Sequence, residues 1–271
     1  NSSAGEITLD EIYQAIAAHY QLDDALTDRI KQAEIELEIG LIQTRPAGKR
    51  LWDTAMRSGK PVSIISDMYL PAWVIGKMLE KAGYTGYQKL YVSSEYGVRK
   101  KEGGLFDVVL AELDLSPEKI IHIGDNAAAD IAMPKARGML SFRLLRALDR
   151  MRGNPYYKEI FHPRRGAGEK PRSIIAGLIA AKLFDMPAGA GAEETMFMGS
   201  PYNLGYAAIG PMLVGYMQWL TRQAQKEGLG RLYFLSREGW VLKQVYDALN
   251  KDNPQAVPSH YLYSSRRAVR V

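Results

Sequence analysis

The sequence predicts an α/β fold in which a doubly wound parallel sheet follows an N-terminal helical segment and precedes a second, smaller α/β unit. Two observations predict it, together with one rule of sheet topology. Between residues 46 and 148, short apolar runs typical of buried strands alternate with segments of helical periodicity. Parallel strands need helical crossovers, so this alternation indicates helices on both faces of one sheet. The same alternation returns after residue 173, behind a stretch rich in Arg, Gly and Pro.

Composition excludes several classes of protein. The 271 residues are 46% hydrophobic and 24% charged, which are ordinary values for a globular chain of one large or two modest domains. The sequence has no cysteine, which excludes a disulfide scaffold, thiolate metal sites and a cysteine nucleophile, and fits a reducing compartment. Its apolar runs are far shorter than the roughly 18 to 20 residues that cross a bilayer. We therefore expect a cytoplasmic protein without a membrane partner.

Positive charge gathers in the middle of the chain. Between residues 131 and 172, eleven Lys or Arg face three Asp or Glu, whereas the net charge of the whole chain is only +5. Such a segment can mark an anion-binding surface. No nucleic-acid motif accompanies it, so we interpret it as a solvated connection and expect no nucleic-acid partner.

Residues 1 to 45 read as a helical cap segment. Thr8 is placed as an N-cap and Glu11 completes a capping box, which predicts a first helix. A second helix is expected from about Leu22 to Gln43. Its apolar residues recur at helical spacing beside a run of glutamates, and they are Ile30, Ala33, Leu37 and Leu41. We interpret the two as helices of a small bundle.

Residues 46 to 148 alternate helix and strand. Glycines that follow the predicted helices, such as Gly59 and Gly83, are typical of helix ends. The predicted strands are Pro61 to Ile65, Lys89 to Val92, Ile120 to Ile123 and Leu140 to Leu144. The predicted helices are Lys49 to Ser58, Pro71 to Ala82, Gly104 to Leu113 and Ala128 to Arg137.

Residues 149 to 172 are expected to form a basic linker, and residues 173 to 271 a second α/β unit. That unit should contain a long helix from about Asn203 to Lys226. Both units place a serine after each of two strands, with nearly equal separations. An internal duplication is one reading of this pattern. The other is that serine is simply common at the carboxyl ends of such strands. The serines are Ser66 and Ser94 in the first unit, and Ser236 and Ser265 in the second.

Candidate functional residues follow from the rule that ligands bind outside the carboxyl ends of parallel strands. Ser66 offers a hydroxyl and nearby backbone amides for a phosphate oxygen. Lys100 offers a positive charge that can neutralise a phosphoryl group. Asp125 and Asp130 provide paired carboxylates, which are ligands that Mg²⁺ accepts. His122 lies inside a predicted buried strand, and we interpret it as a core histidine with a partner rather than as a catalyst.

These residues belong to three motifs, and the order of the motifs along the chain is informative. The motifs are Ile-Ile-Ser66, Lys100-Lys-Glu-Gly-Gly-Leu-Phe106 and His-Ile-Gly124-Asp125-Asn-Ala-Ala-Ala-Asp130. Together they resemble motifs two, three and four of the haloacid dehalogenase (HAD) superfamily, over about residues 45 to 145. The resemblance implies a Rossmann-like core with a helical cap ahead of motif two. It also implies a magnesium-dependent phosphohydrolase that acts on a small phosphorylated substrate through an aspartyl-phosphate intermediate.

The resemblance assigns a role to each site residue. Ser66 would bind the transferring phosphoryl group, with Asp67 beside it in the substrate site. Lys100 would hold nucleophile and phosphate together, and Lys101 is the competing choice for this role. Asp125 would ligate Mg²⁺, and Asp130 would assist the metal site or orient Lys100.

One motif of the family has no counterpart here. Its first motif, an Asp-x-Asp pair that supplies the nucleophile, should precede the cap, and the early carboxylates Asp10 and Glu11 read as part of a helix start. We therefore expect a fragment that lacks the nucleophile and is inactive by itself. The alternative is a non-catalytic, HAD-like binding module associated with saccharide or glycosyltransferase systems. The association is implied by Ser-Asp-Met-Tyr-Leu-Pro71 and Ser-Ser-Glu-Tyr-Gly97, which resemble a bacterial subgroup of predicted hydrolases. Members of that subgroup carry a second Rossmann-like part, and some accompany glycosyltransferase modules.

Overall fold

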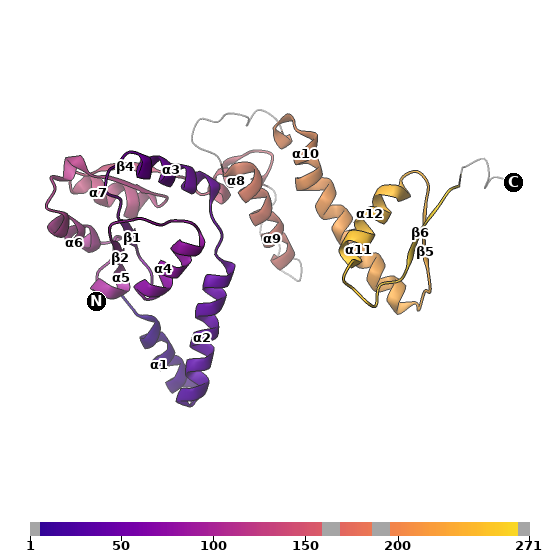
Figure 1. Cartoon of the computed structure of the whole chain (residues 1–271), viewed down its shortest axis with the longest axis horizontal. Helices are drawn as coiled ribbons and strands as arrows, with labels where there is room; N and C mark the ends of the chain where they lie inside the picture. The colour runs from indigo at the N-terminus through magenta and orange to yellow at the C-terminus, as the bar shows by residue number, and fades with distance from the viewer. Residues whose placement is uncertain (1–5, 159–168, 186–195, 265–271) are drawn as a thin grey trace. The chain divides into compact units, whose positions relative to one another are not determined.

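The computed structural model describes residues 6–158, 169–185 and 196–264 (Figure 1). Two compact units divide these residues. The first contains the chain up to Gly153 and again Phe184 and Asp185, and the second contains the other described residues. Within the described part, no helix is both long enough and apolar enough to span a membrane.

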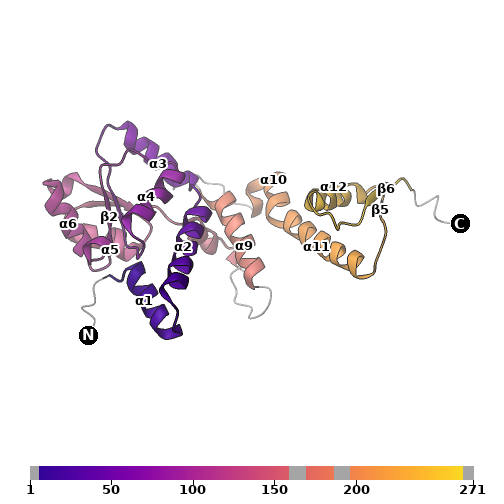
Figure 2. The same cartoon turned by 60° about the horizontal axis from the view of Figure 1, so that its bottom comes forward.

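Unit 1 begins with a helix pair, α1 (Leu9–Tyr20) and α2 (Asp24–Leu41), which lie side by side in Figure 1 and Figure 2. The predicted capping box is confirmed, because the Thr8 hydroxyl accepts from the Glu11 N–H and the Glu11 carboxylate accepts from the Thr8 N–H. The pair packs its buried side chains against α4 (Ala72–Lys81) in one apolar core. The predicted cap segment is thus part of the core of unit 1.

Helix α2 turns an unexpected face to that core. An amphipathic helix normally buries its apolar stripe, yet α2 buries Ile35, and the stripe that the sequence displays is exposed. The buried face is also apolar, because Ile39 and Ile42 pack against the same core as Ile35. Next to it, the Glu34 carboxylate accepts hydrogen bonds from the hydroxyls of Tyr13, at 2.6 Å, and Tyr69, at 3.0 Å. Burial and the Glu34 carboxylate raise the pKa of Tyr13 to about 12, so this hydroxyl stays a donor.

The rest of unit 1 alternates helices and short strands, as predicted. After α3 (Pro46–Arg57), the strands are β1 (Ile64–Ser66), β2 (Leu90–Val92), β3 (Ile121–Gly124) and β4 (Leu140–Arg143). Between and after them lie α4, α5 (Ser93–Tyr96), α6 (Gly104–Leu113), the 3₁₀ turn η1 (Pro117–Lys119), the π-helix η2 (Ala127–Ala132), α7 (Met133–Ala136) and α8 (Ala147–Gly153).

The strands of unit 1 form two parallel pairs. Strand β1 pairs with β2, with Ile64 opposite Leu90, and β3 pairs with β4, with Ile121 opposite Leu140. The fold is therefore α/β with small parallel sheets. Among the described residues no strand joins the two pairs, so the single doubly wound sheet stays a prediction. The Ile64 N–H donates to the Lys89 carbonyl at the start of β2. The backbone groups of alternate residues in a strand point to opposite edges, so those of Ile65 point to the edge of β1 away from β2.

Helix α6 packs on both strand pairs. Its Leu105 and Val109 form a buried cluster with Tyr91 of β2, against which Ile65 of β1 packs. Its Phe106 ring lies edge to face with the ring of His122 on β3, with ring centres 5.0 Å apart. One helix therefore holds both pairs in the same unit.

Unit 2 is mostly helical. Its helices are α9 (Glu169–Ile179), which continues into the π-helix η4 (Ala180–Phe184), the 3₁₀ turn η5 (Met196–Gly199), α10 (Pro201–Leu204), the π-helix η6 (Gly205–Ile209), α11 (Gly210–Lys226) and α12 (Gly239–Asn250). Strands β5 (Leu232–Leu235) and β6 (Ser259–Leu262) pair in parallel on one side of α11 and α12. The predicted long helix is thus α10, η6 and α11 in succession.

Two predicted details differ from the structure. The linker was expected from residue 149, but α8 continues to Gly153, because Met151 is buried and Arg146, which directly precedes the helix, pairs with Asp149 in its first turn. The predicted pair of serines at the ends of β5 and β6 was Ser236 and Ser265. Ser265 lies outside the described residues, and the Ser236 hydroxyl instead accepts from the Ser264 N–H at 2.9 Å.

Candidate functional site

Asp67 anchors the loop that leads into α6. It follows β1 directly, and its carboxylate accepts hydrogen bonds from the backbone N–H of Lys100 at 2.7 Å and of Lys101 at 3.3 Å. A carboxylate placed this way holds Lys100 next to the end of β1, where Ser66 lies. From the sequence, Asp67 was expected in the substrate site. In the structure its side chain forms hydrogen bonds to the backbone of this loop.

Lys100 points into a buried cluster. Its ammonium donates to Asp130 Oδ1 at 2.7 Å, and His122 Nε2 lies 3.1 Å from the same oxygen. The Lys100 side chain is 14% exposed and that of Asp130 is 4% exposed, whereas Lys101 is exposed. The structure thus brings Lys100, rather than Lys101, to the ends of the strands. It also shows that the partner expected for His122 is Asp130.

The backbone around Asp130 fixes its carboxylate. Asp130 lies in the π-helix η2, and π-helical turns often occur at functional sites. The Asn126 N–H donates to Asp130 Oδ2 at 2.9 Å, and the Asn126 side chain caps the first turn by accepting from the N–H groups of Ala128 and Ala129. Gly124 leaves the necessary space, because a Cβ at this position would overlap the Asp130 carboxyl group.

These contacts determine the charge of Asp130. Burial acts to raise its pKa, but the hydrogen bonds from His122, Lys100 and the Asn126 N–H outweigh burial and lower the pKa well below its ordinary value. Asp130 is therefore a carboxylate at neutral pH, and it holds the Lys100 ammonium in one place.

Serines at the end of β2 hold the loop that follows β1. The fully buried Ser93 hydroxyl accepts from the Met68 N–H at 2.9 Å, and the Ser94 hydroxyl donates to the Leu70 carbonyl at 3.0 Å. Ser94 is thus a structural residue. Ser66 ends β1 opposite Val92, at the same end of the strand pair as these two serines.

Asp125 has the more accessible carboxylate of the proposed metal pair. Its side chain is 41% exposed and lies 3.3 Å from the Arg146 guanidinium. Both Asp130 oxygens are already engaged. Among the residues that the structure describes, no group of three or more acidic or histidine side chains is arranged to hold a metal ion. Mg²⁺ is often held by one or two carboxylates together with phosphate and water oxygens. Asp125 could be a ligand in such an open site, whereas the described residues do not form a site made of protein ligands alone.

Several supporting residues were not identified from the sequence. Arg137 makes two hydrogen bonds to Asp107, at 2.6 and 2.9 Å, which tie α7 to α6. Gly103 precedes α6 with φ +88° under the Arg137 guanidinium, where a Cβ would overlap it. The sequence did contain a sign that His122 lies near Asp130. His122 comes two residues before Gly124 on the same strand, so it faces the same side of the strand as Gly124, which contacts Asp130.

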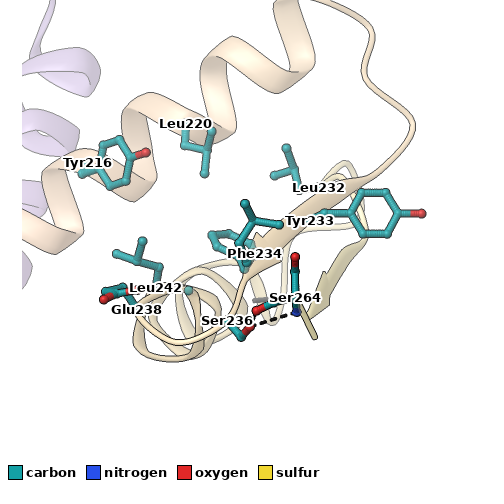
Figure 3. A pocket seen from close by; sticks show the side chains of 11 residues that line it. Tyr216, Leu220, Leu232, Tyr233, Phe234, Ser236, Glu238, Leu242 and Ser264 are labelled. Atoms are coloured by element: carbon teal, nitrogen blue, oxygen red, sulfur yellow. Dashed lines mark hydrogen bonds between the residues drawn. The ribbon is translucent and has the colours of Figure 1, made fainter. Parts of the chain in front are cut away.

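Unit 2 has a pocket of its own (Figure 3). It measures about 560 Å³ and is lined mainly by apolar residues from α11, β5 and α12, including Tyr216, Leu220 and Leu242. Ser236, Ser264 and Glu238 add polar groups at one end, and Tyr233 points away from the centre in Figure 3. All of its lining residues belong to unit 2, whereas Lys100 and Asp130 belong to unit 1.

Comparisons with known proteins find little. No protein-family model and no curated protein matches the chain. A solved structure described as a dehalogenase with an intermediate complex is similar at 17% sequence identity, with a TM-score of 0.37. The match covers 51% of this chain and 58% of that one, so this chain spans little more than half the length of its neighbour. A likeness this distant carries no argument about activity.

Proposed function

We propose that unit 1 binds a phosphoryl group at Ser66 and Lys100 and is the substrate-positioning part of a magnesium-dependent phosphohydrolase of HAD type. One observation carries the proposal. An ammonium that is only 14% exposed is held 2.7 Å from the buried carboxylate of Asp130, in the turn of π-helix that comes soon after β3 and the candidate metal ligand Asp125. Such an arrangement fixes a positive charge in advance, which is how a developing phosphoryl charge is stabilised.

Each residue has a separate task in this proposal. The Ser66 hydroxyl donates to a phosphoryl oxygen, and the Lys100 ammonium neutralises another. Asp130 positions Lys100 and remains ionised, while Asp67 holds the loop by its two backbone hydrogen bonds. Asp125 would hold Mg²⁺, which when bound supplies further neutralisation of the phosphate charge.

The covalent step needs a group that these residues do not supply. In this chemistry a carboxylate oxygen forms a bond to phosphorus while the ester oxygen leaves, and water then hydrolyses the acyl phosphate. Ser66, Lys100 and Asp125 orient a phosphoryl group without providing that carboxylate. We therefore expect the present sequence to bind phosphate and to leave phosphomonoesters intact.

Activity tests the proposal against the binding-module alternative. A longer version that carries an Asp-x-Asp pair ahead of residue 1 should hydrolyse a generic aryl phosphate in the presence of magnesium. Replacement of Lys100 or Asp125 by Ala should abolish this hydrolysis. If the longer protein folds and stays inactive towards sugar, nucleotide and small-acid phosphates, a non-catalytic saccharide-associated module becomes the better account.

Metal binding is tested independently of turnover. Titration with Mg²⁺, followed by calorimetry or NMR, should show weak binding that disappears in Asp125→Asn, because the remaining ligands are water and phosphate oxygens. Unchanged binding by that variant would place the metal elsewhere.

A further inference from the structure

Helix α2 carries a second apolar surface beyond the one that unit 1 buries. Leu37 is 61% and Leu41 75% exposed, and Leu26, Ile30 and Ala33 are exposed with them. At 100° per residue these five side chains fall on one stripe, opposite the buried Ile35. The stripe covers residues 26 to 41, roughly 22 Å of helix at 1.5 Å per residue.

The spacing along this stripe is that of a helix seam. Leu26, Ile30, Ala33 and Leu37 are separated by four, three and four residues, the pattern of alternating a and d positions in a heptad. Arg29 and Glu36 flank it on one side, and both are exposed. The Glu36 carboxylate accepts from the Gln32 side chain at 3.0 Å on the surface of the same helix. On the other side the less exposed Glu34 accepts from the hydroxyls of Tyr13 and Tyr69. One flank therefore presents an exposed basic residue and an exposed acidic residue, one heptad apart, to an external partner.

We propose that two copies of this chain associate through an antiparallel pairing of their α2 helices. In that register, Leu26 of one copy meets Leu37 of the partner subunit, and Ile30 meets Ala33 of the partner subunit. Each layer occurs twice because the contact is two-fold symmetric. The same register places Arg29 opposite Glu36 of the partner subunit, again twice, so the charged flank is complementary to itself.

The composition of the stripe favours the antiparallel arrangement over the parallel one. Parallel helices would place Ala33 against its own copy and leave a gap, while Ile30 crowds its own copy. Antiparallel helices pair the small Ala33 with the larger Ile30 in both inner layers of the contact, so the seam is packed evenly along its length. They also place Arg29 beside the exposed Glu36, whereas a parallel pair would place Arg29 against Glu34, which is less exposed and binds two tyrosine hydroxyls inside unit 1.

Sedimentation equilibrium over a wide concentration range measures the association directly. The chain should show a concentration-dependent dimer, and Leu37→Glu should weaken it roughly a hundredfold, because symmetry places each new charge in the interface twice. Leu37 is exposed, so this variant should keep its circular dichroism spectrum. The matched control is Leu115→Glu, an exposed leucine of unit 1 outside α2, which should leave the dimer unchanged. A chain that stays monomeric up to ~1 mM overturns the proposal, as does equal weakening by the control.

Two further variants test the register. Arg29→Glu and Glu36→Arg should each weaken the dimer, and the double exchange should restore it. Because the chain has no cysteine, a mixture of Leu26→Cys and Leu37→Cys proteins should form a mixed disulfide, while each variant alone should form none across α2. Cross-linking of Leu26→Cys with itself, or failure of the double exchange to restore association, contradicts the antiparallel pairing.

Discussion

Asp130 determines the geometry of the unit 1 site because three donors converge on one buried carboxylate. Lys100, His122 and the Asn126 N–H all reach it, and Gly124 leaves the space in which it lies. Removal of one partner would leave a buried charge or polar group without a hydrogen bond, which is unfavourable. The Asp130 carboxylate and its three donors therefore stabilise one another. The site is therefore organised before any ligand arrives.

Replacement of Asp130 by Asn should destabilise unit 1 by about 3 kcal/mol at pH 7, because the Lys100 ammonium would stay buried without a negative partner. The pKa of Asp130 is lowered on folding, so its ionised form adds stability above the unfolded value of roughly 4, and that stability is lost as the pH falls towards the lower folded value. Urea unfolding should thus show that the gap between Asp130→Asn and the parent narrows below pH ~4. A gap that stays constant from pH 7 to pH 3 would contradict this assignment.

Sequence reasoning reached the site residues but not all of their tasks. Motif order placed Lys100 and Asp130 together, since both were expected to follow strands of one parallel sheet, and the structure brings the two side chains together although their strands belong to separate pairs. The task of Asp67 could not be read, because its partners are backbone N–H groups more than thirty residues away, and nothing in the side-chain pattern marks them.

At the scale of elements, helix α3 depends on a residue from far along the chain. The Arg45 side chain gives α3 no cap, and Asp185 supplies one by accepting from the Ala47 N–H at 2.8 Å and from Arg45 Nε at 2.6 Å. Arg45 also donates to the Leu145 carbonyl. The Asp185 side chain is 3% exposed and that of Arg45 is 31% exposed, so this contact is a partly buried ion pair and a helix cap at once.

Asp185→Ala should therefore lower the free energy of unfolding of unit 1 by about 2 to 3 kcal/mol, the cost of losing a helix cap together with a charge-assisted hydrogen bond to the partly exposed Arg45. The matched control is Asp53→Ala, which removes the i,i+4 partner of Lys49 from an exposed part of the same helix and should cost at most about 1 kcal/mol. Urea denaturation measures both. Similar losses in the two variants would show that Asp185 does not act as a buried cap.

The positions of elements were predictable, but the faces they bury were only partly so. Alternating apolar runs located every strand of unit 1 to within a few residues, and the Thr8 capping box located the start of α1. Periodicity also found the stripe on α2. It could not reveal that the core would take the other apolar ridge of the helix, which carries Ile35 and Ile39, beside the Glu34 carboxylate that binds two tyrosine hydroxyls.

At the scale of the whole molecule, the chain leaves unit 1 after Gly153 and returns to it at Phe184 and Asp185. A boundary between two units was predictable from the basic, proline-containing segment. The return was not, because it depends on one carboxylate that reaches the start of α3. The parallel pairing of the strands in unit 1 was likewise predictable. Their division into two small sheets was not, because the sequence does not show which strand edges form hydrogen bonds with each other.

Trypsin should cut first between Arg152 and Arg172 and leave two resistant pieces. Because Asp185 lies on the second piece and caps α3 on the first, the nicked pieces should still elute together in gel filtration under native conditions. The same digestion of Asp185→Ala should let them separate. Pieces of the parent protein that elute apart, or uniform resistance through the segment, would contradict this picture of the chain path.

Phosphate binding at Lys100 is the most direct test of the proposed function. Inorganic phosphate, added with and without magnesium, should shift the side-chain NMR signals of Lys100 and of residues near Ser66. Lys100→Met should weaken phosphate binding at least ~10-fold, as expected for the loss of one charge-assisted hydrogen bond, while the neighbouring control Lys101→Met should bind like the parent. Binding that survives Lys100→Met, or that falls equally in Lys101→Met, would contradict the proposal that this buried lysine holds a phosphoryl group.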